Sequence, residues 1–160
     1  RQRQMGRGGR FVIVRIDEQG ERIPLTIADA DPVRGTITLV VQVVGKSTAQ
    51  MATLKPGDCL RDVVGPLGAA THVARWGTAV VIGGGIGVAP AHPIAQALKA
   101  AGNTVISILG ARTQSLLIME EEMRRTSDEV IVCTDDGSYG LKGFVNHALS
   151  DFIAKRGKPD

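Results

Sequence analysis

Residues 80–90 are Val-Val-Ile-Gly-Gly-Gly-Ile-Gly-Val-Ala-Pro, so an apolar run passes through a glycine loop into a segment with an early proline. This order predicts a strand, a tight loop and a helix, because the first helical turn tolerates the missing N–H of Pro90. Glycines let a backbone approach a pyrophosphate closely, and a helix N-terminus attracts anions. The spacing differs from G-x-G-x-x-G, since Val88 occupies the place of the third glycine. A glycine turn that serves only the packing of strand against helix is also compatible with this stretch.

The composition excludes several classes of function. The chain has 160 residues, of which 43% are hydrophobic, enough for one ordinary domain or two small ones. No apolar run reaches the roughly 18 residues of a membrane-spanning helix, and the first residues are polar, which predicts a cytoplasmic protein with no membrane partner. The net charge of +3 owes much to the arginines of residues 1–10, which we expect to form a basic, flexible tail. Because the rest is near neutral and poor in aromatic residues, we do not expect nucleic acid as a partner.

The cysteines and histidines do not form a recognisable chemical site in the sequence. Cys59 and Cys133 lie far apart, which indicates neither a zinc site nor a disulfide framework, and we expect both thiols to be buried. Two thiols also fall short of the four ligands that a [2Fe-2S] centre generally requires, so we expect no metal in this chain. Three histidines lack a Ser or Cys at a recognisable catalytic spacing: His72, His92 and His147.

The pattern of predicted elements changes once along the chain. The first part contains short β runs separated by turn residues, at 11–16, 23–28, 36–44 and 59–64. Such runs predict part of an antiparallel barrel or sandwich. The second part alternates strands at 79–82, 104–109 and 129–133 with helices that end at 102 or cover 115–125 and 143–155. This alternation predicts a parallel α/β sheet, with a boundary near residues 72–77.

Two further expectations follow from this organisation. In the last predicted helix an apolar stripe that begins with Phe144 and Val145 should face the parallel sheet. Both ends of the sequence look incomplete, because the first strand begins within the barrel and a fourth parallel strand should follow the last helix. We therefore expect a fragment, or a subunit that another chain completes.

A possible phosphate contact precedes the second β run. Arg22 stands before Pro24-Leu25-Thr26 on a predicted strand, so a guanidinium could contact phosphates and a hydroxyl could contact the edge of a ring. An exposed arginine without a ligand is the simpler interpretation of this pattern.

Two loops and one turn supply further candidate binding residues. The turn at Gly45, Lys46, Ser47 and Thr48 is rich in N–H and O–H donors. It could form an anion-binding nest, although a plain hairpin turn explains it equally well. The loops follow the second and third parallel strands and contain Gly110, Arg112, Asp135 and Asp136. Ligands of open α/β sheets bind at these strand ends, whereas two adjacent aspartates without a third ligand do not indicate a metal.

Five segments occur in the order found in ferredoxin-NADP reductase-like electron-transfer flavoproteins: 22–26, 44–48, 65–68, 83–90 and 134–140. The chain resembles this family over residues 11–153. Within it, the chain most resembles the small FAD subunits of NADH-dependent ferredoxin:NADP oxidoreductases, also called sulfide dehydrogenase beta subunits. It is also similar to the electron-transfer subunits of dihydroorotate dehydrogenases.

The resemblance implies a fold and a set of site residues. It implies an FAD-binding β-barrel, incomplete, over residues 11–74 and a Rossmann-like NAD(P)-binding α/β domain over residues 75–160 that lacks its final strand and iron–sulfur module. The FAD phosphates are assigned to Arg22, Gly45, Lys46, Ser47 and Thr48. The flavin ring is assigned to Pro24, Leu25 and Thr26. The nicotinamide dinucleotide is assigned to Gly84, Gly85 and Gly87, with Gly110, Arg112, Asp135 and Asp136 around its adenosine half.

The implied activity is that of an FAD-dependent NAD(P)H oxidoreductase. Hydride transfer from NADH, with NADPH possible, needs positioning rather than an acid–base side chain. The implied partners are a larger flavin and iron–sulfur subunit and ferredoxin or a similar carrier, and a [2Fe-2S] centre is expected only in a missing C-terminal part. The alternative is a non-enzymatic nucleotide-binding regulatory or assembly module that retains the fold, and a flavin spectrum separates the two.

Overall fold

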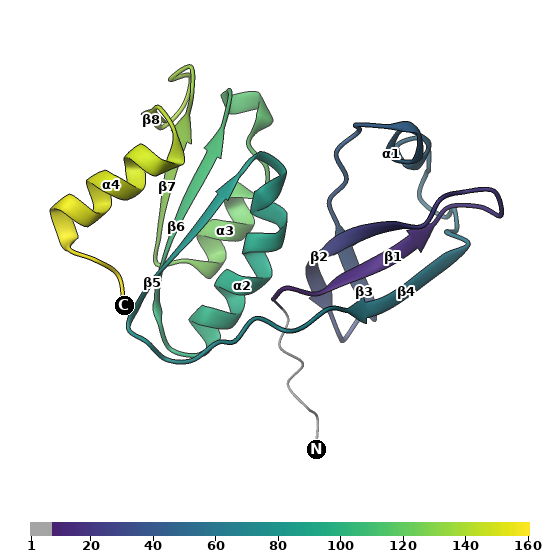
Figure 1. The fold of residues 1–160 in the computed structure, drawn as a ribbon, viewed down its shortest axis with the longest axis horizontal. Helices are drawn as coiled ribbons and strands as arrows, with labels where there is room; N and C mark the ends of the chain where they lie inside the picture. The colour runs from purple at the N-terminus through teal and green to yellow at the C-terminus, as the bar shows by residue number, and fades with distance from the viewer. Residues whose placement is uncertain (1–7) are drawn as a thin grey trace.

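The computed structural model describes residues 8–160, which form two sheets and four α-helices (Figure 1). One of these helices contacts both sheets. Most of the expected basic tail, residues 1–7, lies outside the described residues. Arg10 donates a hydrogen bond from Nη1 to the carbonyl oxygen of Gly68 (2.8 Å), and its own carbonyl accepts the amide of Ile27 (3.0 Å). The end of the expected tail thus contacts the first sheet through Arg10, and its flexibility stays a prediction.

The first sheet is antiparallel, with the strand order β3-β2-β1-β4. Its strands are β1 (Phe11–Arg15), β2 (Ile23–Asp31), β3 (Thr36–Leu39) and β4 (Asp62–Leu67). Alternate residues of β1, Val12 and Val14, are buried and form a small core with Ile27 of β2, as expected for strands with one covered face. This confirms the predicted antiparallel sheet, although β3 ends at Leu39 rather than at Val44.

A short helix, α1 (Lys46–Met51), replaces the hairpin turn that the sequence suggested at residues 45–48. The Thr48 hydroxyl oxygen accepts hydrogen bonds from the amides of Val44 (2.9 Å) and Gly45 (3.0 Å). These contacts satisfy backbone donors just before the helix, which is how a capping side chain stabilises a helix start.

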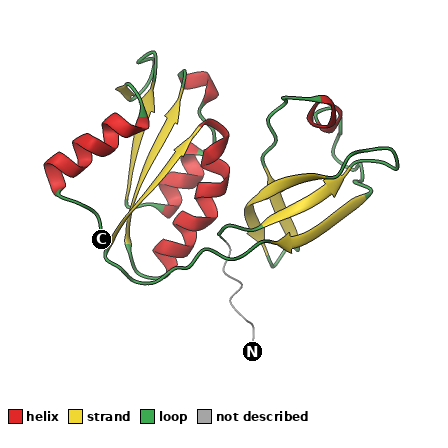
Figure 2. Cartoon of the chain, viewed as in Figure 1, coloured by secondary structure: helices red, strands yellow, loops and turns green. Residues whose placement is uncertain are grey.

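The second sheet is parallel, with the order β5-β6-β7-β8. Its strands are β5 (Thr78–Gly84), β6 (Thr104–Ala111), β7 (Glu129–Thr134) and β8 (Leu141–Lys142). One face is covered by α2 (Val88–Ala100) and α3 (Glu120–Thr126), and the other by α4 (Val145–Arg156) (Figures 1 and 2). This confirms the predicted strand and helix alternation, whereas the two-residue β8 was not expected. None of the helices within residues 8–160 has the length and apolar character that crossing a membrane requires.

The glycine loop and the loop after β6 each contain a short 3₁₀ turn, η1 (Gly85–Gly87) and η2 (Gln114–Leu116) respectively. Because η2 and an irregular segment precede it, α3 begins at Glu120 rather than near Ser115 as predicted.

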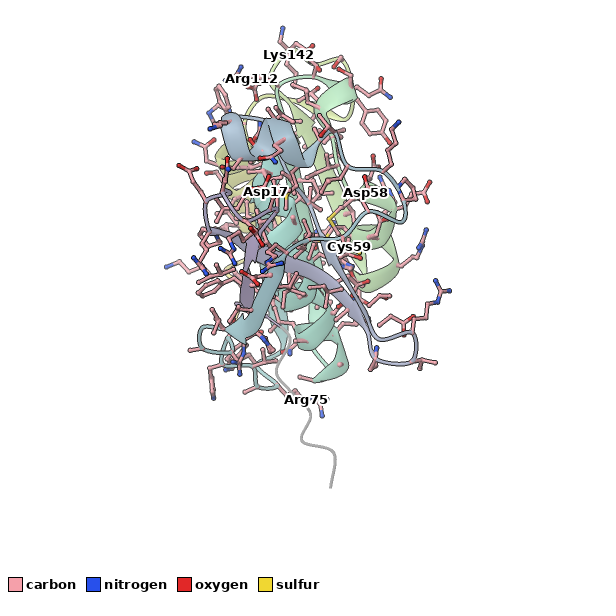
Figure 3. The ribbon with its side chains drawn as sticks, turned by 90° about the vertical axis from the view of Figure 1, so that its right-hand side faces the viewer. Asp17, Asp58, Cys59, Arg75, Arg112 and Lys142 are labelled. Carbon is pink, nitrogen blue, oxygen red and sulfur yellow. The ribbon has the colours of Figure 1, made fainter. Side chains whose placement is uncertain are left out.

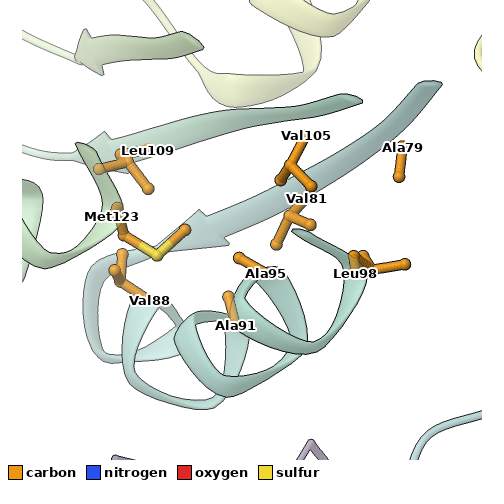
Figure 4. Close-up of a cluster of buried hydrophobic side chains, with 9 residues drawn as sticks. All are labelled: Ala79, Val81, Val88, Ala91, Ala95, Leu98, Val105, Leu109 and Met123. Carbon is orange, nitrogen blue, oxygen red and sulfur yellow. The ribbon is translucent and has the colours of Figure 1, made fainter. Parts of the chain in front are cut away.

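The main hydrophobic core lies between the parallel sheet and the α2–α3 layer (Figure 4). It consists of Ala79, Val81, Val88, Ala91, Ala95, Leu98, Val105, Leu109 and Met123. A smaller cluster under α4 contains Ile108, Cys133 and Ala148. Burial raises the pKa of the Cys133 thiol, whereas Cys59 is exposed, so the expectation of two buried thiols is wrong for Cys59. The predicted stripe on α4 is wrong for Phe144, which is 56% exposed and precedes the helix.

Candidate functional site

A cleft of about 580 Å³ lies at the carboxyl ends of β5, β6 and β7. One wall comes from the segment after β3, at Val40, Val41 and Gln42. The other wall consists of Gly84, Gly85, Ile86, Gly110, Ala111, Arg112, Ser115, Leu116, Ile118, Asp135, Phe144 and Val145. Both the position and the volume are typical of small-molecule sites in open α/β sheets, which occupy about 300–1,000 Å³.

The glycine loop contains glycines of two kinds. A Cβ at Gly83 would lie 2.8 Å from the Cα of Val88, so the packing of α2 against β5 requires this glycine. Gly84 (φ −116°, ψ 132°) and Gly87 (φ −64°, ψ −12°) have conformations open to any residue, and a Cβ there would meet no atom within 4 Å. Gly85 has φ +52°, a left-handed conformation that favours glycine. The chain itself thus gives no packing reason for glycine at 84 and 87, and a group that approaches this backbone from outside would supply one.

The glycines expected to contact the nucleotide do not all line the cleft. Gly84 and Gly85 line the cleft, whereas Gly87 lies one turn away, at the start of α2. Gly110 also lines the cleft, but a side chain there would collide with Val145, so the packing of α4 alone explains this glycine.

Hydrogen bonds join the loops after β6 and β7. The amides of Asp135, Asp136 and Gln114 donate to the Ala111 carbonyl (3.1 Å), the Arg112 carbonyl (3.2 Å) and the Ser138 hydroxyl (2.9 Å), respectively. The two loops therefore form one continuous rim of the cleft.

Thr134, for which the sequence suggested no role, closes the loop after β7. Its side chain is fully buried, and Oγ1 donates to the carbonyl of Tyr139 (2.7 Å) and accepts the amide of the same residue (3.0 Å). The Tyr139 hydroxyl donates to Oε1 of Glu120 on α3 (3.1 Å). Thr134, at the end of β7, therefore holds the far side of the loop at Tyr139, and Tyr139 in turn is held to α3. A hydroxyl at the buried end of a predicted strand was the only sequence signal for this role.

The two adjacent aspartates have different surroundings. Asp135 lines the cleft. The Asp136 carboxylate accepts hydrogen bonds from the hydroxyl (2.7 Å) and the amide (2.9 Å) of Ser138, which lower the pKa of this carboxyl. Asp136 thus stabilises its own turn, whereas Asp135 is the one of the two that lines the cleft.

Positive charge is available at the same end of the molecule. Arg112 lines the cleft and Lys142 follows the neighbouring loop, and both lie at the top of the view in Figure 3. Within the described range, neither side chain takes part in an ion pair. Neither cation is therefore already held by a carboxylate among residues 8–160, although Asp135 lines the same cleft.

The expected flavin residues lie along β2, outside this cleft. Arg22 precedes the strand, is 62% exposed and reaches the Asp62 carboxylate only at 3.8 Å, while Arg15 holds the same oxygen at 2.6 Å. Arg22 is therefore loosely held and accessible. Strand alternation places Pro24 and Thr26 on one face.

Leu25 differs from its neighbours on β2. Its side chain packs with Val12, Val14 and Ile27 in the core of the antiparallel sheet. The structure therefore places Pro24 and Thr26 on one face of β2 and Leu25 on the partly buried core face, and the contact between Leu25 and the flavin ring stays a prediction.

The helix α1 brings a second set of donors close to Arg22. The Ser47 hydroxyl donates to Oε2 of Glu21 (2.7 Å), the residue before Arg22. Lys46 is exposed, and the Thr48 hydroxyl is already used at the helix start, where it donates to the Gly45 carbonyl (3.0 Å). The structure thus brings residues 45–48 and the start of β2 together, as one surface separate from the cleft.

Sequence reasoning missed the apolar part of the cleft. Val40 and Val41 were assigned to a strand, and Phe144 to a buried helix stripe. A hydrophobic pattern cannot distinguish a residue that faces a core from one that faces a ligand. Within residues 8–160, no three or more His, Cys, Asp or Glu side chains lie together where they could hold a metal ion.

Comparisons with known proteins agree with these observations. No family model matches the chain. It is 48% identical over 150 residues to a dihydroorotate dehydrogenase B (NAD(+)) electron transfer subunit homolog of Thermotoga maritima, a match that covers 94% of this chain and 53% of that protein. It is 37% identical over 155 residues to the electron transfer subunit of dihydroorotate dehydrogenase B of Bacillus cereus, with 93% and 59% covered. The chain thus spans somewhat more than half the length of these curated relatives.

Solved structures give the same result. A chain of the NADH-dependent reduced ferredoxin-NADP oxidoreductase, described in connection with flavin-based electron bifurcation, has a TM-score of 0.88 at 44% identity, covering 94% of this chain and 54% of that one. A cytochrome P450 reductase of Amycolatopsis has a TM-score of 0.69 at 22% identity, with 94% and 50% covered, which shows a shared fold alone. The sequence identity to the electron-transfer subunits and the common arrangement of the two sheets show that the chain belongs to the ferredoxin reductase-like family.

Proposed function

We propose that this chain is an electron-transfer flavoprotein subunit that binds FAD and NADH and passes a hydride from NADH to the flavin. The observation that carries the proposal is the cleft at the glycine loop, whose walls come from the segment after β3 and from the parallel sheet. The names of its relatives support it, since they describe an electron transfer subunit, an NAD(+)-linked enzyme and an NADH-dependent oxidoreductase.

We assign the dinucleotide to residues 75–160. Gly84 and Gly87 leave their backbone open on the side where a side chain would project, because no protein atom lies within 4 Å of the place that a Cβ would take. A pyrophosphate can approach the backbone there. Gly110 and Arg112 form the floor and rim of the same cleft.

We assign FAD to residues 11–74. Arg22, Lys46 and Ser47 would hold its phosphates, because the contact between Ser47 and Glu21 places them at one end of the sheet. Pro24 and Thr26 would hold the ring system, since they occupy the face of β2 opposite the core.

The chemistry requires little of the side chains beyond positioning. When bound, FAD would supply the two-electron acceptor that hydride transfer needs. The chain orients the donor with the glycine loop, and Val40, Val41 and Phe144 exclude water from the cleft with apolar surface. No side chain has to gain or lose a proton in this step.

We propose NADH rather than NADPH as the donor. Asp135 lines the cleft, and a carboxylate there repels the extra phosphate of NADPH, whereas Arg112 on the same rim attracts it. The names of relatives that mention NAD(+) and NADH support NADH as the donor. A rate of flavin reduction with NADPH at least about tenfold above that with NADH would contradict this choice.

The proposal includes a destination for the electrons and a compartment. We propose a larger iron–sulfur flavoprotein subunit and a ferredoxin-like carrier as partners. The exposed free thiol of Cys59 suits the cytoplasm, because reducing compartments preserve such thiols.

The test is reconstitution of the purified chain with FAD, followed by anaerobic stopped-flow mixing with NADH. We expect a flavin absorption spectrum that bleaches on mixing. A chain that binds NADH in a calorimeter but takes up no flavin would instead support the non-enzymatic nucleotide-binding module. To test the phosphate contact assigned to Arg22, the same measurement is made on Arg22→Ala. Arg34→Ala removes an arginine from the exposed turn between β2 and β3 and is its matched control for the loss of a surface charge.

A further inference from the structure

A buried polar contact joins the two sheets through α2. His92, in the second turn of α2, is 2% exposed, and its Nδ1 lies 2.9 Å from the carbonyl oxygen of Ala28 on β2. Because a carbonyl oxygen only accepts, Nδ1 carries the proton and donates this hydrogen bond. The contact spans 64 positions of sequence and connects the strand of the antiparallel sheet to a helix of the parallel sheet.

A second contact lies one helical turn further along the same face of α2. Gln96 donates from Nε2 to Oδ1 of Asp29 (3.2 Å), the residue after Ala28. The other amide atom of Gln96, Oε1, is buried without a partner among residues 8–160. Residues four apart share one face of a helix, so His92 and Gln96 both face β2. There they contact two consecutive residues, Ala28 and Asp29. We call Ala28, Asp29, His92 and Gln96 the β2–α2 seam.

The seam connects the two surfaces to which the proposed function assigns the cofactors. Upstream on β2 lie Pro24 and Thr26, and α2 begins directly after the glycine loop. A rotation of one sheet relative to the other would change the separation of these surfaces without altering either one. His92 and Ala28 are both buried, so loss of this hydrogen bond would remove a partner from a carbonyl that water cannot readily reach.

We infer that His92 is a positioning residue: its hydrogen bond to Ala28 sets the placement of the glycine loop relative to the flavin strand and thereby the rate of hydride transfer. This inference rests on the proposed function. Hydride transfer depends steeply on geometry, and a misplacement of 1 Å can cost about a hundredfold in rate.

The test compares two variants of matched shape in the full chain loaded with FAD. In His92→Asn, Nδ2 occupies the place of the imidazole Nδ1 and can donate the same hydrogen bond. In His92→Leu, a methyl group occupies this place and cannot. His92→Phe, closer to histidine in volume, takes the place of the Leu variant if that variant does not fold.

We expect the rate of flavin reduction at saturating NADH to fall by about tenfold or more in His92→Leu and to stay within about threefold in His92→Asn. The dissociation constant of FAD and the half-saturating concentration of NADH should change in neither. Equal rates in the wild type and in His92→Leu would overturn the inference. Slow reduction in both variants with weakened FAD binding would also overturn it, because that result indicates a merely structural residue.

A second measurement needs no cofactor. Residual dipolar couplings of the cofactor-free chain report the relative orientation of the two sheets, which should be the same in the wild type and His92→Asn and different in His92→Leu. If the wild type takes up no flavin or is not reduced by NADH, the proposed function fails, and this orientation alone decides the role of His92. An unchanged orientation in His92→Leu then refutes it.

Discussion

Gly84→Ala should stabilise the fold and weaken NADH binding at the same time. The backbone of Gly84 (φ −116°, ψ 132°) suits alanine, and the new methyl group would meet no protein atom within 4 Å. Replacing glycine by alanine at such a position stabilises a protein by about 0.4–1 kcal/mol, because it restricts the unfolded chain. In a chain of this size the corresponding rise in melting temperature is about 1–4 °C.

The same methyl group projects into the cleft, where the proposal places the dinucleotide. We expect NADH affinity to fall by about tenfold or more, a loss of about 1.4 kcal/mol in binding free energy. Differential scanning fluorimetry gives the first quantity and isothermal titration calorimetry with NADH gives the second.

Gly83→Ala is the matched control for this prediction. Its Cβ would lie 2.8 Å from the Cα of Val88, so backbone must move and the variant should lose about 1–3 kcal/mol of stability. If Gly84→Ala is as stable as expected and still binds NADH as tightly as the wild type, the glycine loop is not the dinucleotide site and the reasoning is refuted.

Three further predictions concern other parts of the chain. Arg22→Ala should weaken FAD binding by about 1.5–3 kcal/mol through loss of a charge-assisted phosphate contact, measured by flavin fluorescence titration, whereas Arg34→Ala should leave it unchanged. Thr134→Val keeps the shape but loses both hydrogen bonds to the loop after β7, so it should raise the KM for NADH, and Thr134→Ser should restore it; an unaltered KM in the Val variant would count against a role for this loop. The hydrogen bond from Lys99 is the main cause of the lowered pKa of Asp128, so the stability that this carboxylate contributes is complete above its unfolded pKa of about 4 and is lost as the pH falls through its lower folded value. The difference in unfolding free energy between the wild type and Asp128→Asn, from urea titrations, should therefore narrow between pH 7 and pH 2, and a constant difference would contradict this assignment.

The sequence by itself determined the class of fold and the position of the glycine loop. Both are local properties: β5 and α2 follow from an apolar run, glycines and prolines within residues 80–93, and the alternation of elements implies a parallel sheet. The same local patterns identified the glycine loop and the polar loops after β6 and β7 as candidate binding segments, and the family resemblance assigned Gly84 and Gly85 to the dinucleotide.

Errors occurred where tertiary contacts decide. Val40 was placed in a strand and Phe144 in a buried stripe, yet both line the cleft, because a hydrophobic side chain has the same local pattern whether it faces a core or a ligand. The opposite surroundings of Asp135 and Asp136 depend on Ser138, whose position the loop conformation sets.

The role of His92 depended entirely on the tertiary structure. In the sequence His92 is an isolated histidine on a predicted helix, 64 residues from Ala28, and no spacing rule relates the two. They meet because α2 packs on its own sheet with one face and on β2 with another. A single strand or helix can be predicted from local propensity, but the pairing of faces between two sheets is a property of the whole packed chain. In this protein that pairing decides which groups border the cleft. It also decides that the hydrogen bond from His92 to Ala28 joins α2 to β2.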